Sequence, residues 1–296
     1  MPVANRKWFY LVLLSLVWGS SFILIKRSLV GFTPIQVGAL RIVFAAIFLF
    51  FIGFKSIKEV KTRQDWKWIA LAGFLSSFFP PILFALAQTQ IDSGVTSIFN
   101  SLTPLNTTLV GVLLFGLIIT KRQIIGVVIG LLGTLILIFA GQEFNPGQNY
   151  WYALFVLLSS LGYAFNINIL KKYLSHLSPL AVTTACFVVI VLPAFVLLLF
   201  SGFFSEIGSS KTMQTSLLYV LVLSFLGTAV AKIYFNKLIL IASPVFAASV
   251  TYTIPLVAIL WGVWDGEQLN IYQLFGAIIV LAGVYLVNKK KRKLNS

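Results

Sequence analysis

The sequence predicts an all-α polytopic membrane protein whose ten transmembrane helices form two inverted five-helix repeats. Three observations lead to this fold class: a very apolar composition, a series of apolar runs of membrane-spanning length, and blocks of sequence that occur twice. The first two observations exclude a soluble protein, and the third divides the chain into halves.

The composition leaves too little polar surface for a soluble domain. Of the 296 residues, 59% are apolar and only 10% are charged, a balance that could not cover a globular protein of this size. Most of the apolar runs have about 20 residues, enough to cross about 30 Å of hydrocarbon as a helix. The ten expected spans are residues 8–26, 34–54, 67–88, 93–119, 122–140, 151–170, 180–201, 214–237, 243–265 and 271–288.

Blocks of the first half recur in the second half without a gap. Pro104-Leu105 has its mate 151 positions later, at Pro255-Leu256, within a longer matched block. The stretch 15–34 has its mates 145 positions later, in the stretch 160–179. We therefore expect one repeat over residues 1–145 and a second over residues 146–296. Because each holds five spans, an odd number, the second repeat enters the membrane from the opposite face.

The charged residues predict the orientation. The chain has 22 Lys and Arg residues against 7 Asp and Glu residues, and in a soluble protein this excess would point to nucleic acid. With the ten spans threaded through a membrane, 17 of the 22 lie on the side of the N-terminus and three on the other side. By the positive-inside rule, both termini are cytoplasmic. We expect a protein of the cell (inner) membrane that contacts the lipid bilayer and no nucleic acid.

The fourth expected span carries a polar stretch with a proline, GVTSIFNSLTPLNTT, from Gly94 to Thr108. Pro104 removes a backbone donor and disturbs the helix one turn back, so a bend or local opening is expected there. Lipid tolerates such a place only where protein or a water-filled cavity satisfies the freed groups. Because the same feature recurs at Pro255, we expect a paired site at the middle of the membrane, as in alternating-access carriers.

These motifs resemble those of a known family. Trp18-Gly19 with Lys26 eight residues on, then Pro34 and Arg41, is similar to the opening of an EamA-type unit of the drug/metabolite transporter superfamily. SGVTSIFNSLTP resembles the fourth helix of that unit, and SPVFAASVTYTIPL with GEQL resembles the same region of the second unit. The resemblance covers essentially the whole chain. It implies a ten-helix carrier of small organic solutes with a central cavity lined mainly by helices 1, 3, 4, 6, 8 and 9.

The first repeat departs from this family pattern at the end of its fourth helix. A Gly-Glu pair often closes that helix in the family, whereas this chain has Ile119-Thr120-Lys121. Any role inferred for that acid therefore applies only to Glu267 of the second repeat.

Two residues beside the prolines are candidates for solute binding. Asn100 lies four residues before Pro104, near the opened turn, and an amide in lipid is costly unless it is paired. Tyr252 follows Thr251, the repeat mate of Asn100, and adds a donor on an aromatic ring. A structural hydrogen bond between helices is the alternative for Asn100.

Three further candidates lie on the first helix of each repeat. Trp18 and Tyr163 are repeat mates at mid-membrane depth, where an interfacial role does not apply; core packing is their alternative. Asn166 and Asn168 cannot share a helix face, and we favour Asn166 because it lies one turn from Tyr163.

Two basic residues fall inside the expected spans. Arg41 lies about 10 Å from the outer end of its helix at 1.5 Å per residue, and Lys232 about 7.5 Å from the inner end. Both are candidates to attract an anionic or zwitterionic solute. Snorkelling of the charge to the interface is the alternative for both, and it is favoured for Lys232.

Glycines on the fifth and tenth helices allow close backbone approach. They assign these helices to scaffold contacts or to a possible homodimer. The glycines are Gly126, Gly130, Gly133, Gly276 and Gly283.

The acidic residues limit the choice of mechanism. All seven Asp and Glu residues lie in loops or at span ends, and proton-coupled carriers usually hold an Asp, Glu or His inside the membrane as a relay. We therefore expect a uniporter or exchanger, or an exporter, of amino acids or related metabolites. A proton-coupled drug/metabolite exporter is the alternative.

Other classes of membrane protein fit less well. An intramembrane lipid-modifying enzyme needs a nucleophile with a base, or paired carboxylates for a metal, and the chain has a single histidine and scattered acids. We expect no catalytic residue, metal site or cofactor. A channel would not need two bent, inverted helices that meet at mid-membrane, although the sequence leaves it open.

Overall fold

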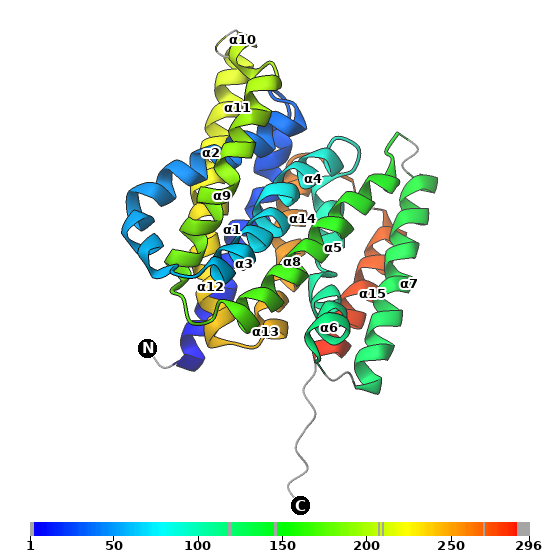
Figure 1. Ribbon diagram of the computed structural model, residues 1–296. Coiled ribbons are helices and arrows are strands. Elements are labelled where there is room, and N and C mark those ends of the chain that lie inside the picture. The colour runs from blue at the N-terminus through cyan, green and yellow to red at the C-terminus, as the bar shows by residue number, and fades with distance from the viewer. Residues whose placement is uncertain are drawn as a thin grey trace, which may run out of the picture.

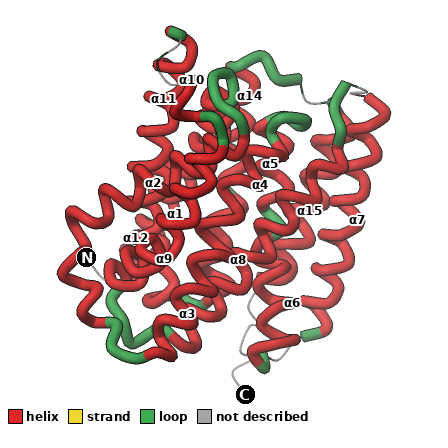
Figure 2. Tube along the Cα trace, turned by 45° about the horizontal axis from the view of Figure 1, so that its top comes forward, coloured by secondary structure: helices red, strands yellow, loops and turns green. Residues whose placement is uncertain are grey.

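The structure, a computed structural model, describes residues 3–117, 120–144, 147–206, 208, 210–268 and 270–288, and every element within them is helical (Figures 1 and 2). The segments of the first half are α1 (Val3–Ser28), α2 (Pro34–Gly53), η1 (Phe54–Glu59), α3 (Arg63–Gly73), η2 (Phe74–Phe78), α4 (Phe79–Ala87), α5 (Ser93–Asn100), α6 (Thr103–Phe115) and α7 (Lys121–Phe144). Those of the second half are η3 (Tyr150–Tyr152), α8 (Ala153–Tyr173), α9 (Pro179–Phe200), α10 (Phe203–Glu206), α11 (Lys211–Val222), η4 (Leu223–Val230), α12 (Ala231–Ile241), α13 (Pro244–Ala248), η5 (Ser249–Tyr252), α14 (Ile254–Trp264) and α15 (Ile271–Asn288).

All ten expected spans coincide with helical segments. Among the described residues, eight segments are long and apolar enough to cross a membrane; these are the first four and the sixth to ninth expected spans. The fifth and tenth spans correspond to α7 and α15, which lie side by side at one edge of the molecule (Figure 1). The prediction of an all-α, polytopic membrane protein is confirmed, and ten membrane crossings stay a prediction.

The second helices of the two repeats begin with matching caps. Thr33 accepts a hydrogen bond from the backbone N–H of Gln36, and Ser178 does the same for Ala181. Each cap is followed by a proline at the first helical position, where its fixed φ favours the helix and its missing N–H costs nothing. The repeated Thr/Ser-Pro pair therefore starts α2 and α9 by the same local chemistry.

Helices α2 and α9 run antiparallel. Gln36, at the start of α2, donates from Nε2 to the carbonyl of Ser201 just beyond the end of α9, at 3.0 Å. Gly53, at the end of α2, packs directly against Thr184 near the start of α9. Since the two helices are repeat mates, their opposite directions show that the halves are inverted.

Helices α7 and α15 are also repeat mates that run antiparallel, and they touch at their glycines. A Cβ on Gly133 would lie 2.7 Å from the backbone N of Val280, and Gly283 packs against the backbone of Gly126 and Gly130. The backbones approach this closely because Gly133 and Gly283 carry no side chain at these contacts. These glycines hold α7 and α15 together within one chain, in keeping with a scaffold role, and the homodimer stays a prediction.

Equivalent helices of the two halves pack against equivalent helices of the opposite half. Helix α1 packs against α14 of the second half, and its mate α8 packs against α6 of the first half. In the same way, α2 contacts the π-helix η4, and α9 contacts α3 and the π-helix η2. The cavity described below lies where these cross-half contacts meet.

Four helices are interrupted at matching places. The third and eighth spans each contain a stretch of π-helix, η2 and η4, in which each turn holds an extra residue. The fourth span breaks between α5 and α6, and the ninth is a 3₁₀ stretch, η5, between α13 and α14. The disturbance expected at Pro104 is confirmed, because α5 ends at Asn100 and α6 begins at Thr103.

Candidate functional site

A cavity of about 80 Å³ lies where the interrupted helices meet. It is lined from both halves, by α1, α2, η2, α4, α5 and α6 of the first and by α8, η4, α12, η5 and α14 of the second. The lining residues are Trp18, Ser21, Phe22, Ile25, Arg41, Ser76, Ser77, Pro81, Phe84, Asn100, Thr103, Tyr163, Gly227, Thr228, Lys232, Phe235, Thr251 and Ile254. The spans match those implied by the resemblance, with helix 2 added through Arg41.

Local side chains satisfy the backbone groups that the interruptions release. Pro104 cannot donate to the carbonyl of Asn100, and the hydroxyl of Thr103 donates to it instead, at 2.7 Å. In η4 the hydroxyl of Thr228 donates to the carbonyl of Leu223 five residues earlier, at 3.2 Å. The polar residues of these stretches thus make an interrupted helix tolerable in an apolar environment. Interruptions of the π type are often found at functional sites.

Arg41 reaches the cavity from α2 and does not lie at the interface. Its side chain is buried, with the residue 9% exposed, and Nε donates to the hydroxyl of Thr228 at 2.6 Å. No carboxylate of the described residues pairs with it. The side chain of Arg41 therefore does not snorkel in this structure.

Lys232 also points inward. The residue is 7% exposed, and Nζ donates to the hydroxyl of Ser76 in η2 at 2.7 Å. The hydroxyl of Ser76 in turn donates to the carbonyl of Ala72 at 2.6 Å. Snorkelling, which the sequence favoured for this lysine, is wrong: the ammonium lines the cavity.

The aromatic mates Trp18 and Tyr163 both line the cavity. The indole N–H of Trp18 donates to the carbonyl of Gly227 in η4 at 2.9 Å, and its ring meets that of Phe235 with centroids 4.9 Å apart. Tyr163 stacks on Phe84 at 6.2 Å. Both rings therefore pack against other aromatic rings and also line the cavity, so the two alternatives left open by the sequence hold together.

Asn100 also lines the cavity, whereas the predicted site residues Asn166 and Tyr252 lie outside its lining. Asn166 is fully buried, and its amide atoms have no hydrogen-bond partner among the described residues. Asn168 is bound to the α6 backbone, since its Nδ2 donates to the carbonyl of Thr107 at 3.1 Å. In the second half, Thr251 lines the cavity in place of its neighbour Tyr252.

The hydroxyls that accept hydrogen bonds from the two cations, those of Ser76 and Thr228, were not among the predicted site residues. Ser76 and Thr228 lie inside the block that repeats at 151 residues, where Ser77 is the mate of Thr228. Hydroxyl residues at the same place in both halves of an apolar span were the available signal.

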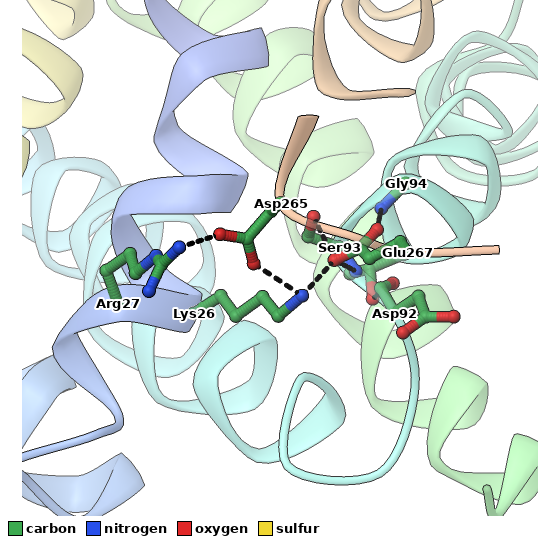
Figure 3. Close-up of polar contacts among 8 residues, drawn as sticks. Lys26, Arg27, Asp92, Ser93, Gly94, Asp265 and Glu267 are labelled. Atoms are coloured by element: carbon green, nitrogen blue, oxygen red, sulfur yellow. Dashed lines mark hydrogen bonds and ion pairs between the residues drawn. The ribbon is translucent and has the colours of Figure 1, made fainter. Parts of the chain in front are cut away.

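A second polar cluster, which we call the ionic end, consists of Lys26, Arg27, Ser93, Gly94, Asp265 and Glu267 (Figure 3). Lys26 at the end of α1 lies between two carboxylates, 2.7 Å from Asp265 Oδ2 and 2.8 Å from Glu267 Oε1. Arg27 pairs with Asp265 on its other side. The cluster thus joins α1 of the first half to the segment that follows α14 of the second.

Glu267 also closes the start of α5. Its carboxylate accepts hydrogen bonds from the backbone N–H of Ser93 at 3.0 Å, from the hydroxyl of Ser93 at 2.7 Å and from the N–H of Gly94 at 3.0 Å. A carboxylate is well placed here because the first N–H groups of a helix have no partner within it. The acid of the Gly-Glu pair therefore caps a helix of the opposite half.

Two ranges of the chain match the model of one protein family. Residues 6–139 and 150–289 each match the family described as the EamA-like transporter family. The chain belongs to the EamA-like transporter family. Each half is thus one EamA-like unit, and as a member of this family the chain is a multi-pass membrane transporter of small solutes.

Curated relatives match nearly the full length. The chain is 27% identical over 288 residues to an "Uncharacterized transporter" of Archaeoglobus fulgidus, covering 97% of this chain and 100% of the relative. It is 28% identical over 290 residues to the "Uncharacterized inner membrane transporter YedA" of Escherichia coli, covering 94% and 91%. It is 23% identical over 293 residues to the "Probable amino-acid metabolite efflux pump" of Salmonella typhimurium, covering 96% and 95%.

A solved crystal structure shares the fold. It superposes with a TM-score of 0.67 and covers 96% of both chains at 16% sequence identity.

Proposed function

We propose that this EamA-like transporter is an alternating-access carrier that exports or exchanges amino acids or related metabolites. The observation that supports this most is the cavity, which takes its lining from both halves at the places where their helices are interrupted. A solute held there contacts both inverted units at once, so a rocking motion of one against the other exposes it to either side.

The relatives and the charge pattern support the finer parts of the proposal. A relative named as an amino-acid metabolite efflux pump matches almost the whole chain, which favours amino acids or their metabolites as solutes. A relative named as an inner membrane transporter and the excess of basic residues on one side favour the inner membrane with both termini cytoplasmic. We assign the two repeats to residues 1–145 and 146–296.

Solute binding is proposed for Trp18, Arg41, Asn100, Tyr163 and Lys232, which line the cavity. Asn166 and Tyr252 are left out of the proposed site because they do not line it. Proton coupling through an intramembrane acid is disfavoured, because no Asp or Glu is among the cavity's described lining residues.

Counterflow in proteoliposomes tests the carrier. Vesicles with the purified full chain are loaded with an unlabelled amino acid or its keto or deaminated analogue, and uptake of the labelled compound is followed without any ion gradient. A carrier gives a transient, saturable accumulation that depends on the unlabelled solute inside. Flux that never saturates contradicts a carrier, and uptake driven strongly by an imposed pH gradient supports the proton-coupled alternative.

Two cavity variants locate the site. Asn100→Ala and Tyr163→Ala each remove a group that lines the cavity, so they are expected to change the rate or the apparent affinity of counterflow at near-normal expression. The matched control is Asn236→Ala, because Asn236 is equally buried but donates to Thr183 outside the cavity lining, at 2.9 Å. Unchanged counterflow in both cavity variants would remove these residues from the site.

A further inference from the structure

Two basic side chains line the cavity of this transporter, and no acidic side chain is among its described lining residues. Arg41 and Lys232 both line it, and each is more than nine-tenths buried. No Asp or Glu is among its lining residues, and no carboxylate within the described part of the chain lies within ion-pair distance of either cation. A buried charge of this kind is costly until something compensates it.

The protein supplies each cation with a neutral partner from the opposite half. Arg41 of the first half donates to Thr228 in η4 of the second half, at 2.6 Å. Lys232 of the second half donates to Ser76 in η2 of the first half, at 2.7 Å. A hydroxyl accepts a hydrogen bond without neutralising the charge, so both cations keep an excess of positive charge that faces the cavity.

The two cations are not inherited from the repeat. At the offsets that align their blocks, the mate of Arg41 is Cys186 and the mate of Lys232 is Pro81. The lining also holds two pairs of aromatic rings in contact, Trp18 with Phe235 and Phe22 with Phe84. The cavity therefore presents positive charge beside an aromatic surface.

We infer that the transported solute is a small organic anion, with a carboxylate on Arg41 and Lys232 and an apolar body against the aromatic wall. The inference rests on the proposed function in that the solute occupies the transport cavity. A carboxylate would form charge-assisted hydrogen bonds with both cations. The ammonium of a zwitterionic amino acid would find like charges and no acid, so the deaminated acid binds better than the amino acid itself.

Four compounds with one carbon skeleton separate the two charges. 4-Methylpentanoate carries only the carboxylate, leucine carries both charges, leucinamide carries only the ammonium, and 4-methylpentanamide carries neither. Binding to the detergent-purified full chain is measured by titration at one ionic strength. We expect 4-methylpentanoate to bind most tightly, about 10- to 100-fold more tightly than its neutral amide, as hydrogen bonds to charged groups predict. Leucine is expected to lie between them and leucinamide to bind least.

Variants of the two cations identify the groups that read the charge. Arg41→Gln and Lys232→Met are each expected to reduce the preference for 4-methylpentanoate over its amide by about tenfold or more, leaving affinity for the amide nearly unchanged. Arg41→Lys keeps the charge and is expected to keep most of the preference, which separates lost charge from lost folding. The matched control is Lys237→Met, five residues further along α12, because Lys237 lies over the ring of Tyr234 and outside the cavity lining.

The results distinguish this inference from the carrier proposal. If leucine binds as tightly as 4-methylpentanoate, or if Arg41→Gln and Lys232→Met leave the order of the four compounds unchanged, the inference is overturned even when counterflow succeeds. If the anion is preferred as expected but the same compound shows no counterflow in proteoliposomes, the charge preference stands and the carrier proposal fails.

Discussion

The two ends of the helical bundle are closed by different chemistry, although the repeat places a lysine at the same position in each. Lys26, at the ionic end, contacts the carboxylates of Asp265 and Glu267. Its mate Lys171 instead donates to three backbone carbonyls beyond and within the last turn of α12, those of Ile239, Leu240 and Ala242, at 3.0–3.1 Å.

The difference follows from the residues opposite each lysine. At the repeat offset, the mates of Asp265 and Glu267 are Leu114 and Gly116, so the first half offers no carboxylate to Lys171. As a result, the Lys26 contacts join the two halves, whereas the Lys171 contacts stay within the second half.

Aromatic rings join the halves at the second end, which we call the aromatic end and which consists of Trp68, Phe115, Lys172 and Tyr173. Trp68 of α3 stacks on Tyr173 of α8 with centroids 4.0 Å apart. Lys172 lies over the ring of Phe115 in α6 at 5.5 Å. An inverted repeat can therefore close its two ends independently, with ion pairs at one end and ring contacts at the other.

The largest effect is expected for Glu267→Ala at the ionic end. The carboxylate accepts four hydrogen bonds from Lys26, Ser93 and Gly94, so its loss is expected to lower the free energy of unfolding by about 2–3 kcal/mol. Thermal unfolding of the purified protein measures this. The control is Glu59→Ala, because Glu59 is exposed and accepts two bonds from Ser178 at the surface. Equal losses in the two variants would show that the contacts of Glu267 at the ionic end contribute no more to stability than those of an exposed carboxylate.

A smaller loss is expected for Tyr173→Ala at the aromatic end. Removal of the ring deletes the stack with Trp68 and the contact with Phe115, which is expected to cost about 2 kcal/mol. The ring also carries a cation–π contact with Lys172 at 5.4 Å but no ion pair, so the loss should depend less on salt than the loss in Lys26→Met. Tyr152→Ala is the control, since Tyr152 contacts Phe155 one turn away in the same span. A loss that shrinks with salt as much as that of Lys26→Met would contradict the assignment of this end.

The lysine mates test the comparison directly. Lys26→Met and Lys171→Met are each expected to lower stability by about 1 kcal/mol at low salt. The side chain of Lys26 is 32% exposed, so raising the salt from about 0.05 to 0.5 M should screen its ion pairs and shrink the effect of its substitution. The effect of Lys171→Met should persist, because its partners are carbonyls. If salt changes the stability losses of Lys26→Met and Lys171→Met equally, the proposed difference between the two lysines is wrong.

The smallest effect concerns pH and Asp92, which directly precedes Ser93 of the ionic end. Burial raises the pKa of the Asp92 carboxyl above its usual value, with a further rise from Glu267 that a hydrogen bond to Gln148 and the charge of Lys26 oppose. The folded protein therefore binds more protons than the unfolded chain between the two pKa values, and the destabilisation by ionised Asp92 is relieved as the pH falls through the folded pKa. Asp92→Asn should be slightly more stable than the parent at pH 7, and the stabilities of the two proteins should converge as the pH falls through the raised folded pKa of Asp92. Curves that stay parallel would contradict this.

Much of the fold could be predicted because lipid leaves few alternatives. Apolar runs of sufficient length must be helical, and a proline such as Pro104 must interrupt its helix. The π-helices had no such local signal, because no proline common to η2 and η4 marks them and the wider turn depends on packing against the other half.

The candidate site could be predicted in part. Trp18, Asn100 and Tyr163 could be predicted to line the cavity because the repeat gives their depth in the membrane. The choice between Asn166 and its neighbours depends on the rotation of α8, which spacing along one helix does not determine. The ion pair of Lys26 with Glu267 spans 241 residues, and only the Gly-Glu pair of the second repeat pointed to it.

The reciprocal bonds of Arg41 and Lys232 have a consequence for biogenesis. Each half, inserted alone, would carry a guanidinium or ammonium whose hydrogen-bond partner, among the described residues, belongs to the other half, and an unpaired charge inside the membrane is costly. During synthesis, Arg41 therefore has to wait for Thr228 of η4, which follows it by 187 residues. A single polypeptide supplies both cations and both hydroxyls at equal stoichiometry.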